Sequence, residues 1–368
     1  MVFIMKNRLK ICIILGTRPE TIKMSSVIRE CQKRKLDYFI LHTNQHYSEN
    51  LDTIFFEELS LPSPKYNLKV GSETQAKQTG KMLIGIEKIL IREKPDIVLI
   101  EGDTNTVLAS ALAATKLHIK IGHIEAGLRS YFREMPEEIN RILTDHCSDF
   151  LFTPTKRTKE ILLNEGIPKE RIFVTGNTIV DAVYQNLKLA KDKSRILEML
   201  NIKEKNYFLI TAHRSENVDK KEKIKGILEG LELVSKKFKL PIIYPIHPRT
   251  EKMIRKFKLK VPEAIKLIEP VGYLDFLQLE TNAKLILTDS GGVQEEACIL
   301  RVPCVTFRDN TERPESLDVR GNILSGTNSK NILKCVLKII NKKRNWKNPF
   351  GDGKAGQIII DVILKQRN

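Results

Sequence analysis

The sequence predicts an α/β protein with two doubly wound domains, each built on a parallel sheet. Short apolar runs alternate with longer amphipathic ones along almost the whole chain, which is typical of parallel strands covered by helices on both faces. The alternation forms two series, and 368 residues accommodate two domains of ordinary size. The expected strands lie at 9–16, 38–43, 96–103, 119–127 and 150–155, and then at 207–214, 241–248, 265–271, 285–292 and 302–309.

The first expected strand, "LKICIILG", runs into a helix whose start has the features of an anion site. Thr17 and Glu20 have the spacing of a capping box, which marks the helix start. Arg18 and Lys23 lie at the positive end of the helix dipole, where cations are mildly unfavourable. Together with the strand, the glycine and the helix amides, these two cations predict a binding site for an anion.

The boundary between the two domains is expected near residue 178, within "VTGNTIVDAV". A Lys-rich helical segment follows, and the second series begins at Tyr207. The predicted domains are therefore 1–178 and 179–353. Because open α/β sheets bind ligands beyond the carboxyl ends of their strands, we expect the two domains to face each other across a cleft.

The chain is strongly basic, with a formal net charge of +17 and a pI near 9.5. This charge permits nucleic acid, a membrane surface or a phosphorylated small molecule as partner. The Lys and Arg residues are mixed with Glu and Asp on helical patterns, and the sequence has no recognised nucleic-acid-binding motif. We therefore expect a solvated cationic surface, with neither nucleic acid nor membrane as partner.

The cysteine pattern and the hydropathy indicate a soluble cytoplasmic protein. No run approaches the length of a membrane span, and "ICIILG" is too short for a signal-peptide core. The cysteines include no C-x-x-C pair, which favours reduced thiols. They are Cys12, Cys31, Cys147, Cys298, Cys304 and Cys335.

One motif at 351–356, "GDGKAG", matches the G-x-G-x-x-G pattern of dinucleotide-binding sites. It follows the turn-like "NWKNPF" rather than a strand, and too few residues remain after it for a βαβ unit. We interpret it as a loop before the last helix. The sequence therefore predicts no nicotinamide cofactor, and we expect no metal.

Polar side chains follow several of the expected strands. Asp103, Glu125 and His213 each stand where a strand ends, and Glu137 opens an acidic helix start in "MPEEINR". Asp103 with Thr104 could merely cap the next helix, and His213 could be an ordinary core histidine. Glu125 is harder to explain structurally, because a carboxylate that leaves an apolar strand needs a partner or a task. Their common placement indicates a site.

The motif "TDSGGVQEEA" is more specific. Ser290, Gly291 and Gly292 leave backbone amides free at a helix start, and glycine permits close approach of a phosphate. Glu296 lies one turn further on, within reach of ribose hydroxyls beside a bound diphosphate. Arg313, in "RDNTERPE", is a candidate phosphate partner. The alternative is an ordinary helix capped by Ser290.

Together these motifs resemble the non-hydrolysing UDP-N-acetylglucosamine 2-epimerases. The likeness covers nearly the whole chain, through "GTRPETIKM", "EGDTNT", "GHIEAGLRS", "MPEEINR", "TGNTIVDA", "TAHRSEN", "LTDSGGVQEEA", "DNTERPE" and "NPFGDGKA". It implies the GT-B architecture of two Rossmann-like domains, with the final helix, 354–368, joining the first domain, and usually a homodimer. It also implies interconversion of UDP-N-acetylglucosamine (UDP-GlcNAc) and UDP-N-acetylmannosamine (UDP-ManNAc), which feeds polysaccharide or glycan synthesis.

The resemblance assigns roles to residues that match the family's motifs. The polar residues Asp103, Glu125, Glu137 and His213 correspond to its catalytic set. Contacts to substrate are implied for Arg18, Lys23, Asp103, Glu125, His213, Val271, Phe276, Ser290, Gly291, Gly292, Glu296 and Arg313, with Phe276 at the uracil and the later residues at the ribose and diphosphate. The anion at the first turn would then be the diphosphate of a sugar nucleotide.

The sequence departs from the family at two positions. Glu101 stands where many relatives have His, which would change the charge, and hence the pKa, near Asp103. Tyr47 stands where bacterial relatives often have a basic residue, in a region that some of them use for a second, activating UDP-GlcNAc. Allosteric activation therefore stays open.

The implied reaction needs elimination rather than direct proton exchange. The C2 proton of the sugar is not alpha to a carbonyl, and the sequence predicts no nicotinamide, so we expect a carboxylate to take this proton as the bond from C1 to phosphate breaks. The products, 2-acetamidoglucal and UDP, recombine with the proton returned from the other face. Asp103 or Glu125 would act at C2 with Glu137 as partner, and which is base and which is acid is left open.

Two enzyme classes and one binding class compete with this interpretation. A GT-B glycosyltransferase would pass the sugar to an acceptor, and a hydrolysing epimerase would release N-acetylmannosamine and UDP. The density of carboxylates favours proton transfer at carbon. A nucleic-acid-binding protein is suggested by charge alone.

Overall fold

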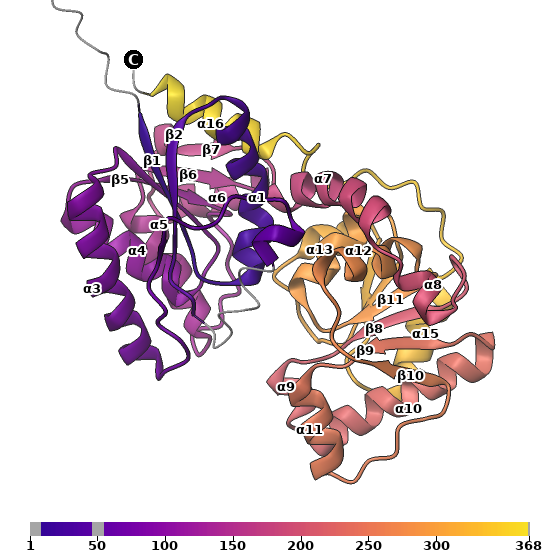
Figure 1. Cartoon of the computed structure of the whole chain (residues 1–368). Coiled ribbons are helices and arrows are strands. Elements are labelled where there is room, and N and C mark those ends of the chain that lie inside the picture. Colours follow the sequence, from indigo (N-terminus) through magenta and orange to yellow (C-terminus); the bar gives the residue numbers. More distant parts are fainter. Residues whose placement is uncertain (1–8, 46–54, 367–368) are drawn as a thin grey trace, which may run out of the picture. The chain divides into compact units, whose positions relative to one another are not determined.

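The computed structural model describes residues 9–45 and 55–366, which form two compact units (Figure 1). The first contains the described residues up to Gln185 and from Gly351 onward, and the second contains Asn186–Phe350. The division lies within α7 (Thr178–Lys193). Each unit has its own parallel sheet and its own apolar core.

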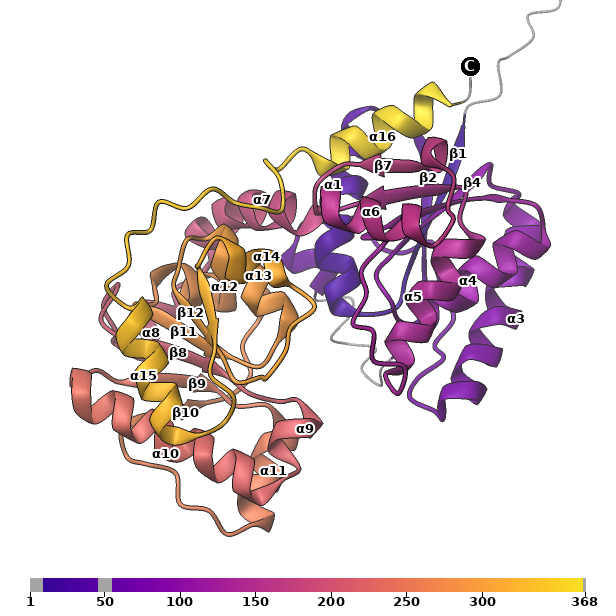
Figure 2. The ribbon, with the colours of Figure 1, turned by 180° about the vertical axis from the view of Figure 1, so that it is seen from behind.

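The first unit is built on a seven-stranded sheet in the order β3-β2-β1-β4-β5-β6-β7. Its strands are β1 (Lys10–Leu15), β2 (Asp37–His42), β3 (Tyr66–Asn67), β4 (Ile97–Glu101), β5 (Lys120–Ile124), β6 (Phe150–Thr153) and β7 (Ile172–Val174). Besides α7, its helices include α1 (Arg18–Lys33), α3 (Gln75–Glu93), α4 (Asn105–Lys116), α5 (Pro136–Cys147), α6 (Lys156–Asn164) and α16 (Ala355–Lys365). Helices α3, α4 and α5 pack in sequence, whereas α16 packs on α1 (Figure 2).

The second unit is built on a six-stranded sheet in the order β10-β9-β8-β11-β12-β13. Its strands are β8 (Phe208–Thr211), β9 (Ile242–Pro245), β10 (Ile265–Ile268), β11 (Leu285–Thr288), β12 (Cys304–Thr306) and β13 (Asn322–Leu324). Its helices include α8 (Ile196–Leu200), α9 (Ser215–Val218), α10 (Lys221–Phe238), α11 (Pro248–Lys256), α12 (Tyr273–Asn282), α13 (Gly291–Ile299), α14 (Pro314–Asp318) and α15 (Ser329–Ile339).

The parallel pairing confirms the predicted α/β class, and the strand order positions the polar loops. Apolar runs fill both faces of each sheet because helices cover them, as the near-continuous buried residues of β1 and β4 show. In the first unit the chain order reverses between β1 and β4, and in the second between β8 and β11. Ligands of open α/β sheets bind at such reversals. The loops after β1, β4, β8 and β11 are therefore the places to look for a site.

The first four residues of the "GDGKAG" segment, 351–354, form a loop before the last helix, as predicted, and the last two begin that helix. Gly351 and Gly353 have positive φ values of 121° and 85°, a conformation that favours glycine. The first amides of α16, those of Ala355 and Gly356, donate to the carboxylate of Asp181 at 3.1 and 3.0 Å. The segment thus anchors α16 to the first unit.

The six cysteines are all unpaired, and four of them are buried. Among the described residues, no helix is both long and apolar enough to cross a membrane. In the same part of the chain, no group of His, Cys, Asp and Glu side chains has an arrangement that could hold a metal ion.

Candidate functional site

The turn between β1 and α1 is tied to the start of α4 by a buried carboxylate. Glu20 accepts hydrogen bonds from the amides of Gly16 and Thr17 and from the hydroxyl of Thr104. Burial raises the pKa of Glu20 to about 7. A Cβ atom at residue 16 would lie 2.0 Å from Oγ1 of Thr106, so glycine is required here. Since Glu20 already takes two amides of this turn, an external anion would depend on side chains.

Lys23 lies between two buried carboxylates. Its Nζ is 2.9 Å from Oε1 of Glu101, at the end of β4, and 2.5 Å from Oε2 of Glu125, after β5. Asn177 also donates to Oε2 of Glu125, at 3.1 Å. The end of β4 and the loops after β5 and β7 therefore surround Lys23 with polar groups. The sequence predicted Lys23 as a ligand of an external anion, but two carboxylates of the protein already neutralise part of its charge.

Glu101 belongs to this carboxylate cluster. Burial raises the pKa of Glu101 well above its ordinary value, Lys23 opposes that shift, and the charge of Glu125 adds to it. Glu125 itself has a φ of +67°, which is uncommon for a residue other than glycine and is frequent at functional sites. Glu101 thus places a second carboxylate on Lys23.

Asp103 is held from the side of α5. Its Oδ2 is 3.3 Å from Nε of Arg141, and its carbonyl accepts a hydrogen bond of 2.9 Å from Asn140. The N-cap residue of α4 is Thr104, as the capping alternative allows, but its side chain makes no capping hydrogen bond. Asp103 is thus a candidate for chemistry, because its carboxylate is 37% exposed.

The two glutamates that open α5 differ in their roles. Glu138 is buried and accepts hydrogen bonds from the amides of Ser130 and Tyr131 and from Arg141. Glu137 is half-buried and makes no hydrogen bond or ion pair with the described residues. Glu138 therefore shapes the preceding loop, whereas Glu137 leaves its carboxylate available.

A buried network that the sequence analysis missed supports the loop after β4. His123 on β5 is paired through Nδ1 with Oδ1 of Asp145 at 2.7 Å and through Nε2 with the carbonyl of Gly102 at 2.9 Å. Burial opposes ionisation of Asp145, but His123 and Arg129 together lower its pKa below the ordinary value. Because Gly102 precedes Asp103, this network fixes the backbone that presents Asp103. The sequence feature that could have indicated this network is a histidine inside an apolar strand.

Arg18 is exposed at the start of α1. Its guanidinium carbon lies 5.7 Å from the centroid of the Phe55 ring, within cation–π range. Tyr47, at the position of the proposed second substrate site, lies outside the described residues.

In the second unit, His213 stands at the end of β8 beside a buried aspartate. Asp289 is fully buried and accepts hydrogen bonds from the amides of His213 and Arg214 and from the side chain of Asn217. Partial burial lowers the pKa of His213, an effect that Asp289 opposes and Arg214 supports. The His213 side chain is 42% exposed, so it is not a core histidine. It packs on His247, with ring centroids 5.6 Å apart.

The start of α13 is open at Gly292 only. Gly291 is buried, with a Cβ atom there 2.6 Å from Oε1 of Glu312, and the amide of Ser290 donates to the hydroxyl of Thr288 at 2.9 Å. Ser290 is the N-cap residue, and its side chain makes no capping hydrogen bond. A Cβ atom at residue 292 would meet nothing closer than Oγ of Ser290 at 4.0 Å, so the backbone at Gly292 is accessible. A helix start of this kind suits an anion.

Three arginines gather around Glu312 near that helix start. Arg308 and Arg214 lie 2.8 and 3.4 Å from its carboxylate. Despite burial, Arg313, Arg308 and Arg214 lower the pKa of Glu312 to about 2. Arg313 also pairs with the buried Glu295 at 2.9 Å. Arg308 also lies 3.6 Å from Glu216, so the three arginines face three carboxylates. Arg313 is the one that the sequence predicted as a phosphate partner.

The remaining predicted residues lie along α12 and α13. Val271 and Phe276 are partly buried and pack on the core below these helices. Glu296 is 7% exposed, and its Oε1 accepts a hydrogen bond of 3.0 Å from the hydroxyl of Tyr273. The structure therefore brings Val271, Phe276 and Glu296 to the same side of the second sheet as Ser290.

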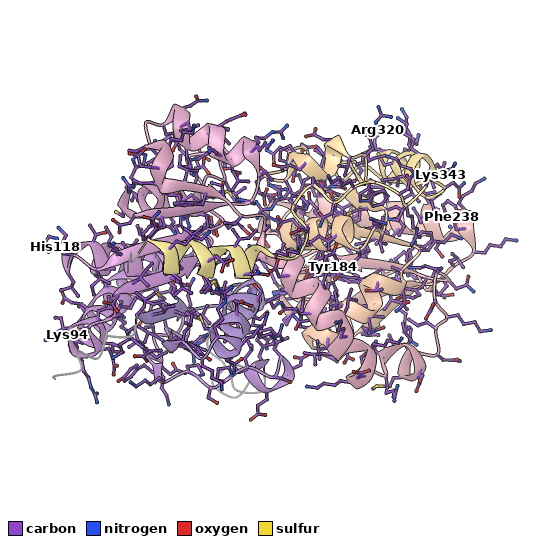
Figure 3. All side chains as sticks on the ribbon, turned by 90° about the horizontal axis from the view of Figure 1, so that it is seen from above. Lys94, His118, Tyr184, Phe238, Arg320 and Lys343 are labelled. Atoms are coloured by element: carbon purple, nitrogen blue, oxygen red, sulfur yellow. The ribbon has the colours of Figure 1, made fainter. Side chains whose placement is uncertain are left out.

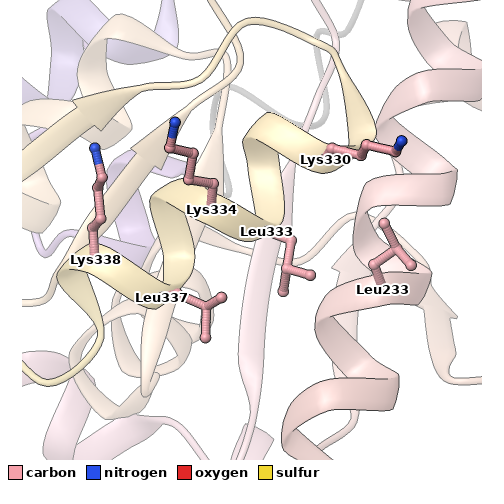
Figure 4. Close-up of a pocket in the computed structure, with 6 residues that line it drawn as sticks. All are labelled: Leu233, Lys330, Leu333, Lys334, Leu337 and Lys338. Atoms are coloured by element: carbon pink, nitrogen blue, oxygen red, sulfur yellow. The ribbon is translucent and has the colours of Figure 1, made fainter.

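Other cationic surface is separate from these groups. Figure 3 shows cations such as Lys94 in the first unit and Arg320 and Lys343 in the second. An apolar groove of about 370 Å³ between α10 and α15 is bordered by a row of lysines (Figure 4). It is lined by Leu233, Lys330, Leu333, Lys334, Leu337 and Lys338, and contains none of the candidate site residues.

Comparisons with known proteins agree with this arrangement. The family model described as UDP-N-acetylglucosamine 2-epimerase matches residues 29–364. The chain is 59% identical over 361 residues to the UDP-N-acetylglucosamine 2-epimerase of Methanocaldococcus jannaschii, covering 96% of this chain and 99% of that protein. It is 58% identical over 364 residues to the corresponding protein of Methanococcus maripaludis, covering 97% and 99%.

A solved structure is similar at the level of the fold. The crystal structure of the Methanocaldococcus jannaschii UDP-GlcNAc 2-epimerase in complex with UDP-GlcNAc and UDP has a TM-score of 0.90, 59% identity, and coverage of 97% of this chain and 99% of that one. The predicted GT-B fold class of two Rossmann-like domains is thereby confirmed. The chain belongs to the UDP-N-acetylglucosamine 2-epimerase family.

Proposed function

We propose that this protein interconverts UDP-GlcNAc and UDP-ManNAc without net hydrolysis. Family membership supports the substrate, since a relative with 59% identity was crystallised with UDP-GlcNAc and UDP. The observation that carries the reaction type is the cluster of Lys23, Glu101 and Glu125 beside the partly exposed Asp103. It offers carboxylates with unequal environments, as proton transfer to and from carbon requires.

The proposed chemistry is elimination followed by readdition. Asp103 or Glu125 takes the C2 proton, a double bond forms between C1 and C2, and the C1–O bond breaks with its electron pair leaving on UDP. The products, 2-acetamidoglucal and UDP, recombine when Glu137 returns a proton to the opposite face of C2. Proton exchange with water then returns Glu137 to its acid form and Asp103 or Glu125 to its carboxylate. Proton and charge thus balance over the cycle, and no oxidant is needed.

The second unit binds the nucleotide in this proposal. Phe276 and Val271 contact the uracil, Glu296 accepts from the ribose hydroxyls, and the amides after Ser290 bind the diphosphate with Arg313. Charge that develops on departing UDP is stabilised by donors already in place, and Arg18 and His213 add to them. We further propose a homodimer whose product feeds polysaccharide or glycan synthesis.

The decisive experiment is incubation with UDP-GlcNAc and no acceptor, followed by separation of the products. A mixture of UDP-GlcNAc and UDP-ManNAc supports the proposal. Accumulation of free N-acetylmannosamine and UDP identifies a hydrolysing epimerase, and unchanged UDP-GlcNAc that reacts only with an added acceptor identifies a glycosyltransferase. Either result overturns the proposal.

Turnover in D₂O tests the mechanism. Elimination places deuterium at C2 of both epimers, because the proton passes through an enzyme group. Glu137→Gln, which blocks only the return of the proton, is expected to release 2-acetamidoglucal and UDP together. Retention of the original C2 hydrogen, with no glucal from any carboxylate variant, would exclude elimination even if UDP-ManNAc forms.

A further inference from the structure

A second carboxylate lies buried beneath Glu296. Glu280 is on α12, two turns after Tyr273, and none of its surface is exposed. No hydrogen-bond donor among the described residues reaches either of its carboxyl oxygens. The carboxyl of Glu296 on α13 lies close enough to that of Glu280 for a hydrogen bond between them. Two carboxyl groups can form this bond only if one carries a proton.

The surroundings place that proton on Glu280. An ionised carboxylate without a donor or a cation loses several kcal/mol of solvation when buried. Glu296 keeps a small exposed surface, and Tyr273 donates to it, which favours its charged form. Burial and the charge of Glu296 raise the pKa of Glu280 well above its ordinary value.

The other titratable groups around Glu280 do not neutralise it. Tyr273 on α12, Tyr207 just before β8 and Cys304 on β12 all interact with its charge, and each is neutral in its ordinary form. Lys205 approaches the end of α12 but donates to the carbonyls of Thr281 and Ala283 instead. Within the described part of the chain, no cation therefore pairs with Glu280.

We propose that Glu280 is a positioning residue, a neutral carboxylic acid that donates a hydrogen bond to Glu296 and holds it for the ribose of the nucleotide. The inference rests on the proposed function in taking Glu296 as the ribose contact. With Tyr273 and Glu280 both donating, Glu296 stays ionised and fixed, and its remaining lone pairs accept the ribose hydroxyls. At alkaline pH, loss of the Glu280 proton places two like charges together and breaks this arrangement.

Two variants distinguish the effect of the proton on Glu280 from the effect of packing by its side chain. Glu280→Gln keeps the size and donates through its amide, but it cannot ionise. Glu280→Met fills the same space without a donor. We expect Glu280→Gln to bind UDP like the unaltered protein at pH 7, and Glu280→Met to bind UDP about tenfold more weakly, the loss of one hydrogen bond to a charged group.

The pH profile of UDP affinity, measured by calorimetry on the full chain, provides the main test. The unaltered protein is expected to lose affinity as pH rises into the alkaline range, whereas Glu280→Gln retains it. The same alkaline decline in both proteins, or equal affinity of Glu280→Gln and Glu280→Met at pH 7, would overturn the proposal.

An infrared measurement tests the proton without any ligand. The unaltered protein at pH 7 should show the carbonyl band of a protonated carboxylic acid that Glu280→Gln lacks and that the exposed control Glu263→Gln retains. Absence of this difference would overturn the proposal. If UDP fails to bind the unaltered protein, the proposed function fails, and the infrared result still decides whether Glu280 is neutral.

Discussion

Buried charge is handled in opposite ways in the two units. In the first, carboxylates outnumber the cation, since Glu101 and Glu125 share Lys23, and the pKa of Glu101 is raised. In the second, three arginines surround Glu312 and lower its pKa to about 2. The first arrangement suits groups that gain and lose protons, and the second suits the binding of an anion.

This contrast arises on two sheets with the same plan. Both reverse strand order at their centre, and both place polar loops at the carboxyl ends of the strands beside that reversal. The difference between the two charge clusters therefore comes from the residues at the strand ends and not from the architecture. Variants of each cluster should accordingly affect different steps.

The largest effect is expected at the carboxylate cluster. Glu125→Gln removes the charge but keeps the shape, and turnover should fall by about a thousandfold if Glu125 transfers a proton. Affinity for UDP, measured by calorimetry, should change little. The exposed Glu160→Gln on α6 serves as control. A parallel loss of UDP binding would mean that Glu125 binds the nucleotide instead.

The next largest effect is expected on stability. Lys23→Met leaves Glu101 and Glu125 buried without their cation, which should lower the free energy of unfolding by about 3 kcal/mol in urea titrations. Adding Glu101→Gln removes one of the two buried charges and should recover part of the lost free energy of unfolding. A double variant no more stable than Lys23→Met would show that Glu101 does not depend on Lys23.

A smaller effect is expected at the arginine cluster. Arg313→Ala should weaken UDP binding by about thirtyfold, the loss of a charge-assisted hydrogen bond. Lys334→Ala, on the lysine row of α15, carries the same change of charge and should bind UDP normally. Equal losses in both variants would show that general positive charge, rather than a built site, attracts the nucleotide.

The smallest effect is expected from Glu20. Its pKa is raised to about 7 in the folded protein, against 4.5 for an unperturbed glutamate, so its contribution to stability is complete below pH 4.5 and is lost as pH rises through 7. Between pH 6 and 7.5 the unaltered protein should lose about 1 kcal/mol of unfolding free energy that Glu20→Gln does not lose. Identical pH profiles in urea titrations would contradict this linkage.

The general fold and the type of site follow from local sequence. Alternating apolar and amphipathic runs fix two parallel α/β sheets because strands buried on both faces must be apolar throughout. The capping box of Thr17 and Glu20 and the loop at 351–356 follow from spacing and turn residues alone. Placement of Asp103, His213 and Ser290 at strand ends likewise needs only the position of each strand.

The partners of these residues were decided by the tertiary structure. Lys23 meets carboxylates 78 and 102 positions away in the chain, and Glu280 meets Glu296 across two helices. Such contacts depend on strand order and helix packing, which hydrophobic periodicity does not encode. The sequence therefore determined which chemical groups stand at the strand ends, and only the packed sheets decided which charges face each other, because burial and proximity together set each protonation state.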